Sequence, residues 1–319
     1  MSKEVKKIMT KTSVAIMGIG GVGGYLGARL ALFYRNASEI AIIFIARGET
    51  LKEIELHGLE LRGTAQINPA IPAIVSDDPD KIGHIDLLIC CVKNYDIENA
   101  LLRYKDCVDE DTIVISFLNG MESPEKIKKI FPQASVWAGC AYIVSTVVKP
   151  GVISVSSTVN RFYFGSEDAQ GSVLGKVAGI LNAAGIEAQG TKDEQQMLWE
   201  KFMFISPFAT ITSALDITVG TILHDEQKKQ VLVDLMLEVQ AVANASGIYF
   251  DKDIIQKRID RLALLPPEAT ASMHNDFRKG NRTELYSLTR YVIELGEKFN
   301  IRTPVYQSML TAIQIRWGA

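Results

Sequence analysis

The stretch Val14-Ala15-Ile16-Met17-Gly18-Ile19-Gly20-Gly21-Val22-Gly23 decides the fold that we expect for the first half of the chain. Four apolar residues predict a short buried strand, and a helical pattern, Val22–Tyr34, follows the glycines directly. In the spacing G-x-G-x-x-G, the first glycine permits a tight turn, the second lets a pyrophosphate approach the backbone, and the third lets helix and strand pack closely. The free N–H groups at the start of that helix attract phosphate. We therefore expect a dinucleotide-binding loop formed by Gly18, Ile19, Gly20, Gly21, Val22 and Gly23, the alternative being a glycine-rich turn without a ligand.

Apolar runs and helical patterns alternate from Ser13 to Gly190. The predicted strands are Val14–Met17, Ile40–Ile45, Asp86–Val92, Thr112–Phe117, Val136–Ile143, Val152–Ser156 and Arg161–Phe164. The predicted helices are Val22–Tyr34, Ser123–Ile130 (with Ser123 as its cap) and Ser172–Ala184. Ile40–Ile45 and Leu87–Val92 are apolar throughout, as strands covered on both faces of a parallel sheet are. The alternation predicts an α/β domain with a doubly wound, Rossmann-type sheet.

The pattern changes after Gly190. Thr191 and Glu194 have the spacing of a capping box, which predicts that a long helix begins there. Further helices are predicted at Val231–Ser246, Lys252–Leu264 and Thr283–Phe299, and no strand pattern follows. We therefore divide the chain into a Rossmann-type domain, residues 1–190, and an all-helical C-terminal domain, residues 191–319.

The composition is that of a globular protein, with 319 residues, 47% of them hydrophobic, and a formal net charge of −3. This mild acidity gives no reason to expect a nucleic acid or a membrane surface as partner. No apolar run approaches the roughly 20 residues of a membrane span. The basic residues 1–11 are not followed by an apolar core, so we expect a frayed tail in a cytoplasmic protein and not a secretory signal.

The cysteines and histidines show no metal-ligand spacing. The four cysteines are Cys90, Cys91, Cys107 and Cys140, and the four histidines are His57, His84, His224 and His274. Cys90 and Cys91 lie inside an apolar predicted strand, which favours reduced thiols in a core. We expect neither a disulfide framework nor a metal site.

Arg47 follows the second predicted strand, where an NAD-binding domain usually carries an acidic residue for the ribose 2′-hydroxyl. An arginine suits a 2′-phosphate instead, so Arg47 favours NADPH. Glu49 is close enough to be the acidic residue of an NAD site, which is the alternative. Nothing else in the chain indicates a flavin site.

Two polar residues come directly after later strands, at the edge of an open α/β sheet where ligands bind. Lys93 follows the predicted strand Asp86–Val92, and Asn119 follows Thr112–Phe117. Each could be an ordinary residue at a strand end, but together with the glycine loop they mark one edge of one sheet.

Lys201 lies in an apolar helical pattern, with Leu198 before it and Phe204 and Ile205 after it on the same face. A buried ammonium is costly unless it is paired. Glu284 has a similar position on the apolar stripe of a later predicted helix. The two residues therefore predict a buried pair, either structural or catalytic.

Several motifs in this order resemble those of the ketopantoate reductase (2-dehydropantoate 2-reductase) family over nearly the whole chain. They are Gly18–Gly23, Ala46–Glu49, Val92-Lys93, Asn119–Met121, Leu198–Lys201, Ser272–Asp276 and Gly280–Glu284. The resemblance implies a Rossmann domain followed by a helical domain and the NADPH-dependent reduction of a 2-oxo acid.

The resemblance also implies roles for single residues. Lys201 matches the general acid, which protonates the alkoxide formed when hydride reaches the keto carbon, and Glu284 matches the carboxylate that holds it. Lys93 and Asn119 match positions near the nicotinamide and the substrate. Ser272 matches a substrate-binding hydroxyl, and Asp276 matches a further position at the substrate site.

The chain departs from the family on the face of the lysine helix. Family members often carry asparagines four and eight residues after the lysine, whereas this chain has Ile205 and Ala209. Ser206 and Thr212 are polar neighbours at other angles. A related 2-oxo acid with a more apolar side chain is therefore an alternative substrate. An NADPH-binding sensor of the same fold and a different hydroxyacid dehydrogenase are the alternative functions. Family members vary in assembly, and a homodimer is the state that we favour.

Overall fold

The computed structural model describes residues 11–64, 68–157 and 160–319, so residues 1–10 of the predicted N-terminal tail lie outside the described residues. Contacts divide the chain into two compact units. One comprises Met1–Leu118 and Glu122–Glu194, and the other comprises Asn119–Met121 and Gln195–Ala319. The short segment Asn119–Met121 thus groups with the helical residues, although the residues on both sides of it belong to the first unit.

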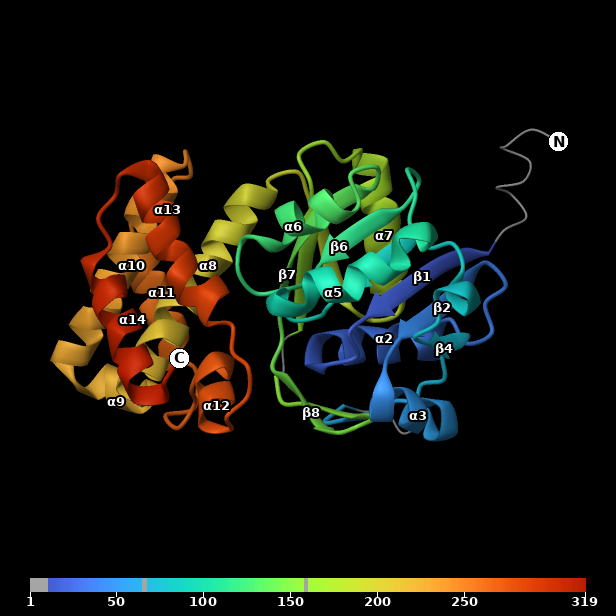
Figure 1. The fold of residues 1–319 in the computed structure, drawn as a ribbon, viewed down its shortest axis with the longest axis horizontal. Coiled ribbons are helices and arrows are strands. Elements are labelled where there is room, and N and C mark those ends of the chain that lie inside the picture. The colour runs from blue at the N-terminus through green and yellow to red at the C-terminus, as the bar shows by residue number, and fades with distance from the viewer. Residues whose placement is uncertain (1–10, 65–67, 158–159) are drawn as a thin grey trace. The chain divides into compact units, whose positions relative to one another are not determined.

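The first unit is built on an eight-stranded sheet with the order β11-β10-β7-β6-β5-β1-β2-β4 (Figure 1). Its strands are β1 (Thr12–Met17), β2 (Ile40–Ile45), β4 (Ile74–Ser76), β5 (Leu87–Cys90), β6 (Ile113–Ser116), β7 (Ser135–Tyr142), β10 (Arg161–Gly165) and β11 (Glu187–Thr191). Neighbouring strands are parallel except for β7 and β10. The strand order reverses beside β1, which is the switch point of a Rossmann sheet, so the predicted fold class is confirmed.

Alternate residues of each central strand enter opposite cores. In β1, Val14 and Ile16 belong to the core that contains α2 (Gly21–Phe33) and α7 (Gly171–Ala183). Ala15 and Met17 belong to the core that contains α5 (Ile97–Leu101) and α6 (Ser123–Ile130). The remaining helical segments of this unit are α3 (Gly48–His57), α4 (Pro79–Ile82), η1 (Asn94–Asp96) and η2 (Leu102–Cys107). Burial on both faces explains why the central strands are apolar throughout.

A second, three-stranded sheet was not expected. Its order is β3-β9-β8, with β3 (Glu60–Arg62), β8 (Ser145–Lys149) and β9 (Val152–Val155). The predicted strand Val152–Ser156 is thus real, but it belongs to this sheet and not to the Rossmann sheet. The prediction that Ser123 caps α6 is wrong. Glu122 occupies the cap position, and the buried Ser123 hydroxyl donates to Ser116 Oγ at 3.2 Å.

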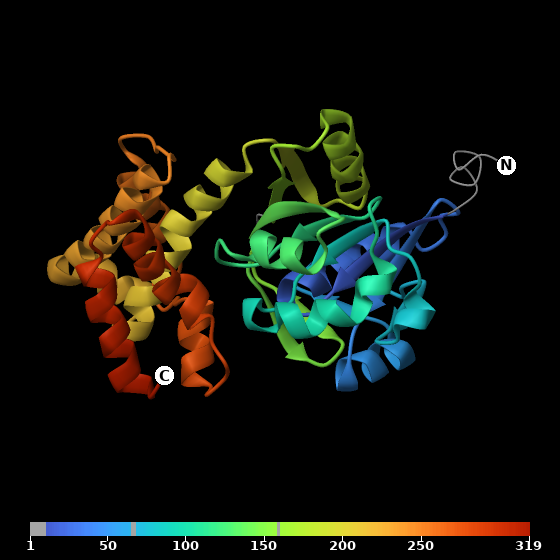
Figure 2. The same ribbon diagram turned by 45° about the horizontal axis from the view of Figure 1, so that its top comes forward.

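The second unit is helical, and no strand follows Thr191 in the described part of the chain (Figure 2). Its helices are α8 (Glu194–Leu215), α9 (Val219–His224), α10 (Glu226–Ala245), α11 (Ile254–Ala263), α12 (Ser272–Arg278), the π-helical segment η3 (Tyr286–Arg290), α13 (Tyr291–Phe299) and α14 (Pro304–Trp317). None of the helices within residues 11–64, 68–157 and 160–319 combines the length and hydropathy that crossing a membrane requires.

Two helix starts differ from the prediction. Thr191 is the last residue of β11, and its hydroxyl accepts from the backbone N–H of Asp193 at 3.0 Å, so α8 begins only at Glu194 and no capping box forms. The helix predicted from Thr283 begins at Leu285. Glu284 precedes it, and its carbonyl accepts from the N–H of Leu288 at 3.0 Å. Glu284 therefore lies at the entry of that helix.

Candidate active site

The glycine loop joins β1 to α2. Gly18 has a φ of +90°, and a Cβ there would lie 2.8 Å from the backbone carbonyl carbon of Cys91. A Cβ on Gly23 would lie 2.1 Å from the oxygen of Gly18. Gly20 differs, because its φ is −90° and an added Cβ would meet no atom within 4 Å. The protein's own packing thus requires glycine at 18 and 23, whereas at 20 the open space fits a phosphate approaching the N-terminus of α2.

The residues behind the loop include one unsatisfied polar group. The buried hydroxyl oxygen of Ser145 has no hydrogen-bond partner among the described residues, and it would lie 3.0 Å from a Cβ on Gly21. Such an orphaned hydroxyl fits a polar ligand at this loop. Cys91, also beside the loop, is a neutral packing group, because burial raises the pKa of its thiol far above the usual value.

A cavity of about 290 Å³ continues from the glycine loop along the carboxyl ends of β1 and β2. Gly18 and Ile19 line it, and so does Arg47, the exposed residue before α3. No acidic residue is among its described lining residues. Glu49, the alternative residue for an NAD site, does not line it and pairs with Lys52 Nζ at 2.8 Å instead.

Two lining residues of this cavity were not anticipated from the sequence. Arg103 and Tyr104 belong to η2, which lies well beyond the second strand in the chain. No motif marks them, since only the folding of η2 against the sheet edge brings them to Arg47.

Lys93 lies at the cap position of η1, three residues after the end of β5, and is partly buried. Asn119 follows β6 and is also partly buried. Both residues therefore follow neighbouring parallel strands, as expected, but Asn119 groups by its contacts with the helical unit.

Lys201 is buried in α8, with 7% of its surface exposed. Its Nζ donates to Asn119 Oδ1 at 3.0 Å. Asn119 is thus one acceptor for the buried ammonium, and the sequence pattern did not predict this contact. The two residues are 82 positions apart, and no local pattern connects them.

Glu284 is also buried, with 3% exposure. It immediately precedes the helical run that begins with Leu285 and continues through η3. π-helical turns occur frequently at functional sites. The proposed role of the Glu284 carboxylate in holding Lys201 stays a prediction.

The polar neighbours of Lys201 on α8 face the protein interior. The hydroxyl of Ser206 is bonded to the carbonyl of Leu288 at 2.7 Å and to Tyr306 OH at 2.5 Å. The hydroxyl of Thr212 donates to the carbonyl of Phe208 at 2.7 Å. Both side chains are fully buried, and their hydroxyls are bonded within the protein. Burial raises the pKa of Tyr306 far above its usual value, so it stays a neutral hydrogen-bonding group.

Ser272 and Asp276 both lie on α12, where Ser272 is exposed and Asp276 is partly buried. Asp216, at the end of α8, fixes this short helix. It accepts from His274 Nε2 at 2.7 Å and from Arg278 Nη2 at 2.7 Å. The bond from Arg278 lowers the pKa of Asp216, and burial lowers the pKa of His274.

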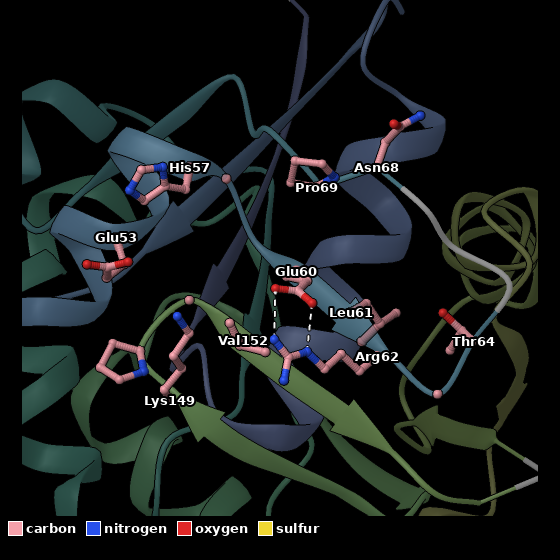
Figure 3. A pocket seen from close by; sticks show the side chains of 14 residues that line it. Glu53, His57, Glu60, Leu61, Arg62, Thr64, Asn68, Pro69, Lys149 and Val152 are labelled. Atoms are coloured by element: carbon pink, nitrogen blue, oxygen red, sulfur yellow. Dashed lines mark hydrogen bonds and ion pairs between the residues drawn. The ribbon is translucent and has the colours of Figure 1, made fainter.

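A second cavity, of about 490 Å³, lies elsewhere in the first unit (Figure 3). Glu53, His57 and Lys149 line it, and Arg62 pairs there with Glu60 at 2.7 Å. None of the predicted site residues lines it. Within residues 11–64, 68–157 and 160–319, no three His, Cys, Asp or Glu side chains are grouped so that they could hold a metal ion.

Two family models together match most of the chain. Residues 14–168 match the family described as Ketopantoate reductase PanE/ApbA, and residues 193–316 match Ketopantoate reductase PanE/ApbA C terminal. The 2-dehydropantoate 2-reductase of Aquifex aeolicus is 26% identical over 310 residues, which cover 94% of this chain and 96% of the relative.

Two solved structures share the fold over nearly the whole chain. The 2-dehydropantoate 2-reductase of Porphyromonas gingivalis is 30% identical with a TM-score of 0.82, covering 94% of this chain and 98% of the other. A D-mandelate dehydrogenase in a ternary structure with NADH and anilino(oxo)acetate is 19% identical with a TM-score of 0.85, covering 96% and 99%. The chain therefore belongs to the ketopantoate reductase family of oxidoreductases.

Proposed function

We propose that the protein reduces a 2-oxo acid to the 2-hydroxy acid with NADPH, and that 2-dehydropantoate is the favoured substrate. The observation that carries this proposal is the buried ammonium of Lys201, held by Asn119 at 3.0 Å at the positions where the family motifs fall. A buried cation with a fixed orientation suits the stabilisation of negative charge that develops on a carbonyl oxygen.

The nicotinamide, when bound, supplies the hydride that reduces the keto carbon. Side chains of the protein stabilise the negative charge that develops on the carbonyl oxygen and supply the proton. An ammonium has three N–H donors, and Asn119 fixes the direction of one. Lys201 then donates a proton to the oxygen of the former carbonyl group, and the buried Glu284 helps to keep the ammonium charged.

The preference for NADPH over NADH rests on the cavity at the ends of β1 and β2. Arg47 lines it, and none of the described lining residues is a carboxylate that could accept from a ribose 2′-hydroxyl. Glu49, the acidic residue of the alternative NAD site, is not among the residues that line this cavity. The glycine loop, Gly18–Gly23, binds the pyrophosphate in this proposal.

Substrate binding is assigned to Lys93, Asn119, Ser272 and Asp276. The identity of the substrate depends on the α8 positions that follow Lys201, where Ile205 and Ala209 carry apolar groups and the family often has amides. Ser206 and Thr212 do not compensate, since their hydroxyls are bonded to backbone carbonyls. A 2-oxo acid with a more apolar side chain is therefore the alternative. A homodimer remains the favoured assembly.

The test is steady-state oxidation of NADPH and NADH with a panel of 2-oxo acids, comprising 2-dehydropantoate, branched aliphatic acids and aryl acids. We expect turnover with NADPH, fastest with 2-dehydropantoate. Turnover with none of the acids, together with tight NADPH binding, would indicate a sensor. A preference for NADH would contradict the interpretation of Arg47.

The variant Lys201→Ala tests the proton donor. We expect kcat to fall by about 10²- to 10⁴-fold, the usual contribution of a general acid, while the affinity for NADPH stays near that of the wild type. Lys192→Ala, which removes an exposed lysine just before α8, is the matched control. Unchanged turnover of Lys201→Ala would exclude Lys201 as the proton donor.

A further inference from the structure

Arg103 shares the wall of the 290 Å³ cavity with Arg47, although the two residues come from different parts of the chain. Arg47 is the residue before α3, and Arg103 lies in η2. The cavity therefore runs from the glycine loop, at Gly18 and Ile19, to two guanidinium groups. Two arginines around one cavity without a described acidic lining residue form a site for a doubly charged anion.

Tyr104, the residue after Arg103, ties η2 to Asp77. Tyr104 has 3% exposure, and its hydroxyl donates to the backbone carbonyl of Asp77 at 3.0 Å. Arg103 Nη1 lies 3.8 Å from the Asp77 carboxylate, at the residue that follows β4. Asp77 thus anchors η2 through its backbone and holds the guanidinium of Arg103 through its side chain.

The positive charges of Arg47 and Arg103 both act on the hydroxyl of Tyr104. Burial raises the pKa of the Tyr104 hydroxyl, and the positive charges of Arg103 and Arg47 each offset part of this effect. Arg47, Arg103 and Tyr104 all line the same cavity.

We infer that Arg103 is a second guanidinium for the 2′-phosphate of NADPH, alongside Arg47, and that it leaves Asp77 when the phosphate binds. The inference rests on the proposed use of NADPH. The pair between Arg103 and Asp77 is long, at 3.8 Å, and both side chains are about half exposed, at 52% and 40%. Such pairs contribute little to stability, whereas arginine binds phosphate through two parallel charge-assisted hydrogen bonds. The exchange of partners is thus favourable.

The experiment measures the dissociation constants of NADPH and NADH for the wild type and for Arg103→Ala, Arg47→Ala and Lys105→Ala. Lys105 is an exposed lysine of η2 that does not line the cavity, so it controls for the loss of one positive charge. Loss of a charge-assisted hydrogen bond corresponds to an increase of about tenfold in the dissociation constant of NADPH for Arg103→Ala. The affinity for NADH should not change, and Lys105→Ala should bind both cofactors as the wild type does.

Two results would overturn the inference. If Arg103→Ala raises the dissociation constants of NADPH and NADH equally, Arg103 contacts a part that both cofactors share, such as the adenine. If Arg47→Ala raises the dissociation constant of NADPH and Arg103→Ala does not, Arg47 alone binds the phosphate. A wild type that prefers NADH refutes the proposed function itself, so the two failures are distinguishable.

Discussion

Replacing Asn119 by leucine removes the acceptor that lies 3.0 Å from the ammonium of Lys201. Lys201 has only 7% exposure, so water replaces the lost acceptor poorly. A hydrogen bond to a charged group contributes about 1.5–3 kcal/mol, and we expect the free energy of unfolding of Asn119→Leu to fall by an amount in that range. The same loss in the transition state corresponds to roughly a ten- to hundredfold decrease in kcat/KM.

A double-mutant cycle isolates this contact from the general effect of each substitution. The cycle compares Asn119→Leu, Lys201→Met and the double variant, with urea unfolding and NADPH oxidation as the two measurements. Methionine keeps much of the volume of lysine without its charge. The double variant should be more stable than the sum of the single losses predicts, because two apolar groups leave no buried donor unpaired.

The size of the coupling energy shows whether the ammonium of Lys201 depends on Asn119 for a hydrogen bond. We expect a coupling of about 0.5–3 kcal/mol in the free energy of unfolding, the range observed for residues in direct contact. A coupling energy near zero would refute the reasoning, because it would mean that Lys201 does not depend on Asn119 for its hydrogen bond. In that case the Lys201 ammonium is held by other groups, and Asn119 acts only on the ligands.

Three further predictions follow from single features. Gly20→Ala should leave the thermal unfolding temperature unchanged, because a Cβ there meets no protein atom within 4 Å, yet it should weaken NADPH binding; equal affinity would show that no phosphate approaches this glycine. The free energy of unfolding should fall as the pH decreases below about 6.5, by up to about 1.4 kcal/mol per pH unit, because burial lowers the pKa of His274 in the folded state and the unfolded state then binds the proton more readily. His274→Gln, which keeps a polar group beside Asp216, should flatten that dependence, and an unchanged pH profile would contradict the assignment. Tyr306→Phe removes the hydroxyl that lies 2.5 Å from Ser206 Oγ, and chemical denaturation should show a loss of about 1–3 kcal/mol; wild-type stability would mean that the buried network around Tyr306 contributes nothing.

The strands that the sequence pattern missed share one position in the fold. β4 and β11 are the two edges of the large sheet, and β3 and β8 are the two edges of the small one. Edge strands are held by backbone hydrogen bonds to one neighbour and pack less side-chain surface, so they need no apolar pattern. Four of the five residues of β8, for example, are exposed. The central strands were predictable because burial on both faces requires apolar residues throughout.

Helix boundaries were less predictable for a related reason. The spacing of Thr191 and Glu194 fits a capping box, but pairing of β11 with β10 keeps Thr191 in the sheet. Glu284 fits the apolar spacing of the helix that follows it, but it precedes Leu285, the first helical residue. At Thr191 the neighbouring strand, and not the local sequence, decides where the helix begins.

The sequence by itself determined the features that depend on neighbouring residues: the glycine loop after a buried strand, the alternation that produces a Rossmann-type sheet, the change to helices, and the family motifs. These features follow from backbone sterics and from the periodicity of burial, which act over a few residues. Only the tertiary structure decided which distant side chains meet. It brought Asn119 to Lys201 across 82 positions and Arg103 to the cavity of Arg47. The physical reason is that such contacts depend on the packing of whole elements, and no local spacing of residues records that packing.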